Sequence, residues 1–274
     1  MSFAMGCANA GLGVGLLVLA PVTHLLIDNY GWRSAYQILA AVILLPLPLI
    51  LIAPWPRILA GPSRRSPNPI KPQKPSLLLP KVIWRSRAFW GLGAIFFFTS
   101  LSIYLVNVQM VAFLTESGFD PIVAASVYGS MSTIAIIGVI CTGFLADLYG
   151  RRRIVSISYG LSLAGFALIW LTGSNPSTAL LILAVVTYGL GMGARGPIIS
   201  TLVARLFPSN VAGVFGSISV GMGLGAGLGA WLSGALFDLT GGYSAGFVVS
   251  MISALLGLSQ FWIVPAIATG KHPT

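Results

Sequence analysis

An arginine at position 195 interrupts the long apolar run Ala179–Leu206. A charge inside a membrane-length apolar segment is costly, so it normally faces a cavity, a partner or the interface. If the run is helical, Tyr188, Met192 and Arg195 share one stripe. A planar guanidinium there could bind a carboxylate with two parallel hydrogen bonds. We therefore predict a substrate contact at Arg195. The alternative is a side chain that donates to nearby carbonyls or reaches the head groups.

A second group of polar side chains, Tyr104, Asn107 and Gln109, lies in the outer half of the apolar run Phe89–Leu114. Tyr104 and Asn107 are three residues apart, which places them on one helix face. They are candidates to line the same cavity as Arg195. Hydrogen bonding between neighbouring helices is the simpler explanation for such residues and is favoured here.

The third candidate is a charged turn between two apolar runs, from Gly143 to Arg153. It carries Asp147, then Gly150, then three consecutive arginines. Three adjacent arginines cannot lie in hydrocarbon, and cationic loops stay on the cytoplasmic side of a membrane, so this turn is predicted to face the cytoplasm. The turn is either a conformational latch or an orientation signal, and Arg152 and Arg153 are the arginines expected to face lipid.

The sequence shows none of the patterns that carry enzyme chemistry, since it has no nucleophile with a matching base and no cluster of metal ligands. Alternating glycines from Gly221 to Gly229 follow no strand, so they indicate close helix packing where one bundle slides on another and not a phosphate loop. Cys7 and Cys141 are expected to be core residues. We therefore expect no enzyme activity, no metal and no cofactor.

The composition defines the elements that must position these residues. Over 274 residues the hydrophobic share is 56% and the charged share is 7%, with a mean hydropathy of +0.93. Such a chain is predicted to be an all-α membrane protein. Eight apolar runs are long enough to cross a bilayer. These are Met5–Leu26, Ala35–Ala53, Phe89–Leu114, Ile122–Leu145, Ile154–Thr172, Ala179–Leu206, Val211–Leu236 and Ala245–Ala268.

The loop charges test this topology. With the arginine turn inside, all of the 15 cations except Arg33 and Arg195 fall on the same side or at its edge, and every acid except Asp147 falls outside. This partition predicts a multi-pass protein of the cell membrane, inner or plasma, with both termini in the cytoplasm. The net charge of +10 is explained by these loops, so no nucleic-acid partner is expected.

One linker divides the chain. Residues 54–87 are rich in proline and basic residues and contain no acid, which predicts an extended, solvated segment. Residues 1–53 then hold two transmembrane helices, and residues 88–274 hold a bundle of six.

The turn matches the Gly-x-Leu-Ala-Asp-x-x-Gly-Arg-Arg signature of the major facilitator superfamily, which the chain therefore resembles. The small-residue pattern from Ala4 to Gly15, with Pro21 and Gly31-Trp32-Arg33, is similar to the fifth helix of the monocarboxylate-porter branch. The resemblance implies twelve helices in two bundles. It also implies that Gly143, Asp147, Gly150, Arg151 and Arg152 form a motif that stabilises one alternating-access state.

An internal repeat supports the comparison, because a shift of 210 residues lays Gly11, Asp28 and Gly31 on Gly221, Asp238 and Gly241. The first two spans then correspond to the seventh and eighth. We therefore expect a chain that lacks the first four of twelve helices.

Two functions follow. The first is a secondary transporter, symporter or antiporter, of a small organic anion such as a monocarboxylate, in the lipid bilayer and with a coupled proton or counter-solute. The second is a truncated or partner-dependent membrane fragment without transport of its own, which assembles with a polypeptide that supplies the missing helices.

Overall fold

The computed structural model describes residues 81–192 and 195–269, together with residues 22, 26, 27, 29–42, 44 and 48. The chain forms two compact units, of which the smaller is Gly15–Lys74. In the smaller unit, residues 29–42 form a helix that includes the start of the predicted second span. Most of the first predicted span, and the linker up to residue 80, lie outside the described residues.

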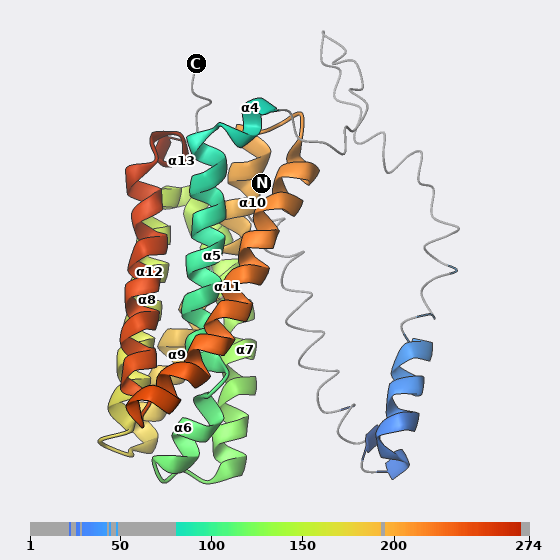
Figure 1. Ribbon diagram of the computed structural model, residues 1–274, viewed down its shortest axis with the longest axis vertical. Helices are drawn as coiled ribbons and strands as arrows, with labels where there is room; N and C mark the ends of the chain where they lie inside the picture. The colour runs from blue at the N-terminus through green and yellow to red at the C-terminus, as the bar shows by residue number, and fades with distance from the viewer. Residues whose placement is uncertain are drawn as a thin grey trace. The chain divides into compact units, whose positions relative to one another are not determined.

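The larger unit is a bundle of helices, shown in Figure 1. Its described residues contain no strand, which confirms the predicted all-α class. In chain order the helices are α4 (Lys81–Trp84), α5 (Arg87–Asn107), α6 (Met110–Glu116), α7 (Pro121–Tyr149), α8 (Arg151–Thr172), α9 (Thr178–Met192), α10 (Gly196–Leu206), α11 (Val211–Thr240), α12 (Ser244–Ile263) and α13 (Pro265–Thr269).

Within the described residues, 5 helical stretches are long and apolar enough to cross a membrane, and α9 is a shorter apolar helix. The stretches are Arg87–Glu116, Pro121–Tyr149, Arg151–Thr172, Val211–Thr240 and Ser244–Ile263. They coincide with five of the six predicted spans of this region. The chain is therefore a multi-pass integral membrane protein.

Two predicted spans are interrupted in the structure. The run Phe89–Leu114 divides into α5 and α6 at Gln109, whose ψ of 5° departs from the helical value. The run Ala179–Leu206 is described as α9, which is traced up to Met192, and α10, which begins at Gly196. Arg195 lies in the turn that interrupts the helix before α10, and residues 193 and 194 lie outside the described residues. Glycines on both sides and a proline in the first turn of α10 explain the second break, because both residue types disfavour a helix interior.

Three of the alternating glycines pack α11 directly on α5. A Cβ at Gly221 would lie 3.1 Å from the carbonyl oxygen of Gly93, and one at Gly229 would lie 2.8 Å from that of Leu101. Between them, Gly225 faces the Phe97 carbonyl at closer range still. This spacing of four residues on each helix brings the two backbones together within one bundle.

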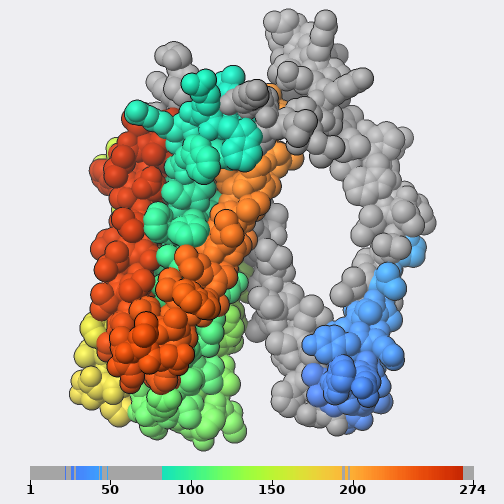
Figure 2. Space-filling model, in the orientation of Figure 1, coloured from blue at the N-terminus to red at the C-terminus, as the bar shows by residue number. Residues whose placement is uncertain are grey.

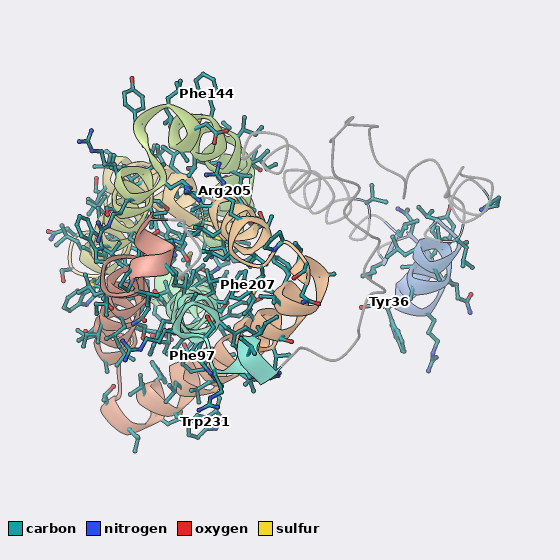
Figure 3. All side chains as sticks on the ribbon, turned by 90° about the horizontal axis from the view of Figure 1, so that it is seen from above. Tyr36, Phe97, Phe144, Arg205, Phe207 and Trp231 are labelled. Atoms are coloured by element: carbon teal, nitrogen blue, oxygen red, sulfur yellow. The ribbon has the colours of Figure 1, made fainter. Side chains whose placement is uncertain are left out.

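The glycines at 223 and 227 meet nothing within 4 Å. Both are exposed on α11. This helix crosses the front of the larger unit in Figure 2. Trp231 of the same helix is 67% exposed and lies at the periphery in Figure 3. The alternating glycines therefore lie on two faces of α11. The face with Gly221, Gly225 and Gly229 packs inside one bundle, whereas sliding of a second bundle on the exposed face stays a prediction.

Candidate functional site

Arg195 is buried at the break between α9 and α10, with only 3% of its surface exposed. Its Nη2 donates a hydrogen bond to the Ser162 hydroxyl of α8. Its guanidinium carbon lies 3.9 Å from the centre of the Tyr159 ring, which is also on α8. The buried Nε has no hydrogen-bond partner. The arginine is therefore held by a hydroxyl and an aromatic face, with one donor left unused.

Among the helices around Arg195, α5, α8, α9, α10 and α12 contain no Asp or Glu. The one acid of α7, Asp147, is exposed in the last turn of that helix. A buried charge without a counter-charge costs several kcal/mol unless hydrogen bonds or an ion compensate it. Arg195 is therefore a candidate anion-binding residue at a helix break, a feature by which membrane transporters form binding sites.

A short chain of polar contacts extends from this site to α5. The Tyr159 and Thr99 hydroxyls lie 2.6 Å apart, and the Ser158 hydroxyl donates to the Gly191 carbonyl at 3.1 Å. Both contacts are buried. They join α5, α8 and the end of α9 around the arginine. A movement of α9 relative to α8 would therefore either disrupt these hydrogen bonds or move their partners as well.

The sequence analysis did not identify Tyr159 and Ser162, which contact Arg195, or Thr99, which is hydrogen-bonded to Tyr159. A signal was present, since Ser158, Tyr159 and Ser162 place hydroxyl groups one helical turn apart inside an apolar run. The contacts of Tyr159 and Ser162 with Arg195 could not be predicted, because they join residues 33 or more positions apart.

Tyr188 and Asn107 meet each other in the structure. Tyr188 is fully buried, and its hydroxyl donates to Asn107 Oδ1 at 2.8 Å. The contact joins α9 to the end of α5, which is the interhelical hydrogen bond that the sequence favoured for Asn107. Met192, at the end of α9, is partly buried and packs on the core.

Tyr104 lies apart from this pair. It is 45% exposed, and its Cβ lies close to Gly229 of α11. The five predicted contact residues are therefore not gathered into one hydrogen-bonded group. Tyr188 and Asn107 form a hydrogen bond with each other. Arg195 instead contacts Ser162 and Tyr159 of α8.

The charged turn connects α7 to α8. Gly150 ends one helix and begins the next with a φ of 89°, a conformation that favours glycine. Gly143 is buried on α7, whereas Asp147 is exposed in its last turn. Arg151 is half-buried and its Nη1 has no hydrogen-bond partner.

Arg152 differs from the expectation that it faces lipid. Its Nη2 donates to the Trp262 carbonyl of α12 at 3.2 Å, and its guanidinium carbon lies 4.0 Å from the centre of the Trp262 ring. The turn is thereby fastened to the end of α12, whereas Arg153 is exposed as expected. A latch at this turn would have to release the contact with Trp262.

At the opposite end of the bundle, Tyr243 links the α11–α12 turn to α6. Its hydroxyl donates to Glu116 Oε1 at 2.9 Å. Burial, this hydrogen bond and the carboxylate charge raise the pKa of Tyr243 from 10.0 to about 12.

We expect the difference in phenolate absorbance between the unaltered chain and Tyr243→Phe to titrate near pH 12. Because the pKa is raised in the folded state, this contact stabilises the fold fully below pH 10 and is lost as the pH rises through about 12. A difference titration centred on the ordinary value of 10.0 would show that the contact with Glu116 is absent.

Taken together, the apolar helices, the broken span and the buried cation define a helical membrane protein with an internal polar site. The family model of the Major Facilitator Superfamily matches residues 1–193 and, in an overlapping second match, residues 92–273. The chain belongs to this superfamily, and its bundle is a facilitator-superfamily helical bundle.

Similar proteins are monocarboxylate transporters. The chain is 30% identical to monocarboxylate transporter 13 of Rattus norvegicus over 271 residues, which cover 96% of this chain and 60% of the relative. It is 30% identical to monocarboxylate transporter 11 of Homo sapiens over 258 residues, which cover 90% of this chain and 53% of the relative. The chain thus spans little more than half the length of these relatives.

Proposed function

We propose that the chain acts in the secondary transport of a small organic anion, with Arg195 as the contact for its carboxylate. The observation that carries this proposal is the buried guanidinium at a helix break, with an unused Nε and no acid in α8, α9 or α10. A carboxylate would supply both the missing charge and the missing acceptor. The similarity to monocarboxylate transporters 13 and 11 supports a monocarboxylate as the solute.

Alternating access is the mechanism that this burial favours. With Arg195 only 3% exposed, a solute could reach it only after α9 and α10 move relative to α8. The two bonds that hold the break, Arg195 to Ser162 and Ser158 to the Gly191 carbonyl, are the contacts that such a movement would exchange. The charged turn, fastened by Arg152 to Trp262, would stabilise one of the two states.

The direct test is uptake of a radiolabelled monocarboxylate into proteoliposomes that contain the chain. Saturable uptake that an unlabelled monocarboxylate inhibits, and that a neutral amide analogue does not, is the expected result. Blue-native electrophoresis of the same preparation distinguishes a chain that acts alone from one that acts only with a second polypeptide. A homogeneous monomer active in liposomes would exclude the fragment hypothesis.

Orientation in the membrane is a separate prediction, in which the basic loops and both termini face the cytoplasm. Cysteines introduced at Ser66 and Ser174, on a background without Cys7 and Cys141, should label oppositely when an impermeant thiol reagent is applied to intact cells. Ser174 lies in the exposed turn between α8 and α9 and should label, whereas Ser66 should label only after the membrane is permeabilised. Labelling of Ser66 in intact cells would reverse the topology.

A further inference from the structure

A hollow of about 440 Å³ lies where the start of α5 meets the end of α12, and two arginines line it. Arg85 and Arg87 flank the turn between α4 and α5, and both are exposed. The remaining lining is formed by Trp90, Gly91, Gln260, Ile263, Val264 and Pro265. No carboxylate is among these residues, so the arginines are available to an anionic group from outside the hollow.

The opposite wall of the hollow is apolar and fixed. A Cβ at Gly91 would lie 2.9 Å from side-chain atoms of both Val264 and Ile267, so α5 packs tightly on the junction of α12 and α13. Ile263 is 68% exposed, although isoleucine is an apolar side chain. One side of the hollow therefore suits hydrocarbon, while the other suits an anion.

Two tryptophans beside the hollow favour a position at the boundary between head groups and acyl chains. Trp90 is exposed, and its Nε1 donates to the Trp84 carbonyl at 2.8 Å. The two rings lie 6.2 Å apart, and Phe89 packs against both of them. Exposed indoles with one polar atom are typical of the membrane interface. The cluster therefore holds Arg85 and Arg87 at head-group depth.

A second hollow, of about 810 Å³, adjoins the same turn and shares Arg85 and Arg87. Its other lining residues come largely from α4, the loop after α10 and the start of α13, and they include no acid. Figure 1 shows α4 and α13 at one end of the bundle. The two arginines thus stand between two hollows that both have apolar walls.

We propose that this groove binds an anionic phospholipid, with the phosphate at Arg85 and Arg87 and an acyl chain along the exposed side chains of Ile263 and Trp90. Arginine forks match phosphate oxygens with paired hydrogen bonds, and exposed apolar walls satisfy the hydrocarbon. A free phosphate would use the arginines alone and would leave the apolar wall unoccupied. The inference concerns a lipid site at the surface and does not depend on transport through the bundle.

The test is tryptophan quenching by brominated lipid in vesicles that contain the full chain. Dibrominated phosphatidylglycerol should quench more strongly than dibrominated phosphatidylcholine, and Arg85→Gln with Arg87→Gln should reduce that preference by at least about tenfold, the lower end of the range for one charge-assisted hydrogen bond. The matched control is Arg64→Gln with Arg65→Gln, which removes the same charge from the linker and should leave most of the preference.

Three further results are decisive. Equal losses in the two glutamine pairs would show general charge attraction and would overturn the site. Arg85→Lys with Arg87→Lys should remain within about threefold of the unaltered chain, since lysine still binds phosphate as a point charge; a loss equal to that of the glutamine pair would show a structural role instead. Displacement of the lipid by excess inorganic phosphate would assign the arginines to free phosphate and overturn the lipid.

Discussion

Arg195→Ala is expected to weaken the binding of small monocarboxylates by roughly 10- to 150-fold, the range of one charge-assisted hydrogen bond of about 1.5–3 kcal/mol. The reason is that the guanidinium is the one buried cation described in the bundle, and its Nε is free to donate. Arg195→Lys keeps the charge but loses the planar fork, so it should weaken binding by an intermediate amount.

Binding is best measured by the shift in thermal unfolding that the monocarboxylate produces, because this shift follows mass action and requires no transport. Uptake in proteoliposomes then shows whether the same substitution affects translocation. The matched control is Ser162→Ala, which removes the partner of Arg195 Nη2 and leaves the cation in place.

The tether hypothesis predicts the opposite pattern. If Arg195 serves mainly to hold the break against α8, both Arg195→Ala and Ser162→Ala should lower the unfolding temperature without ligand, and Arg195→Lys should restore much of it. If Arg195 binds solute, Ser162→Ala should retain most of the ligand-induced shift. An Arg195→Ala chain with unchanged stability and an unchanged ligand shift would exclude both roles.

The sequence predicted the helical class and the positions of most spans, because hydrophobic runs of membrane length are local and strong signals. It could not predict where a span would break. Glycines and Pro197 near Arg195 are local warnings of a break, but Gln109 interrupts α5 and α6 without a glycine or proline beside it. That interruption depends on packing that the sequence pattern does not display.

The candidate site shows the same limit. Arg195 was detectable because a charge in an apolar run is rare, whereas Tyr159 and Ser162 are ordinary membrane-helix residues until their contact with Arg195 is known. The contact between Arg152 and Trp262 joins residues 110 positions apart. It could not be predicted from the turn alone, which suggested that the Arg152 side chain faces lipid. Local chemistry identifies a charge, and only the fold identifies its partner.

The glycines of α11 give the second large prediction. Gly223 and Gly225 are only two positions apart, but one is exposed and the other packs against a neighbouring helix. Gly225 faces the Phe97 carbonyl so closely that a Cβ would force α5 and α11 apart, whereas Gly223 meets nothing within 4 Å. Gly225→Ala is therefore expected to destabilise the bundle by about 1–3 kcal/mol through overpacking, in spite of the better helix propensity of alanine.

Gly223→Ala is the matched control, with the same change on the same helix, and it should be neutral or stabilising by up to about 1 kcal/mol. Thermal unfolding followed by tryptophan fluorescence in detergent gives the ranking, and the fraction of monodisperse protein after solubilisation gives a second measure. Overpacking also predicts that Gly225→Val is worse than Gly225→Ala, since the added methyl groups meet a backbone carbonyl that cannot rotate away. Equal stability of the chains altered at 223 and 225 would mean that α11 does not approach α5 through this face, and the packing that positions Thr99 beside Tyr159 would have to be explained in another way.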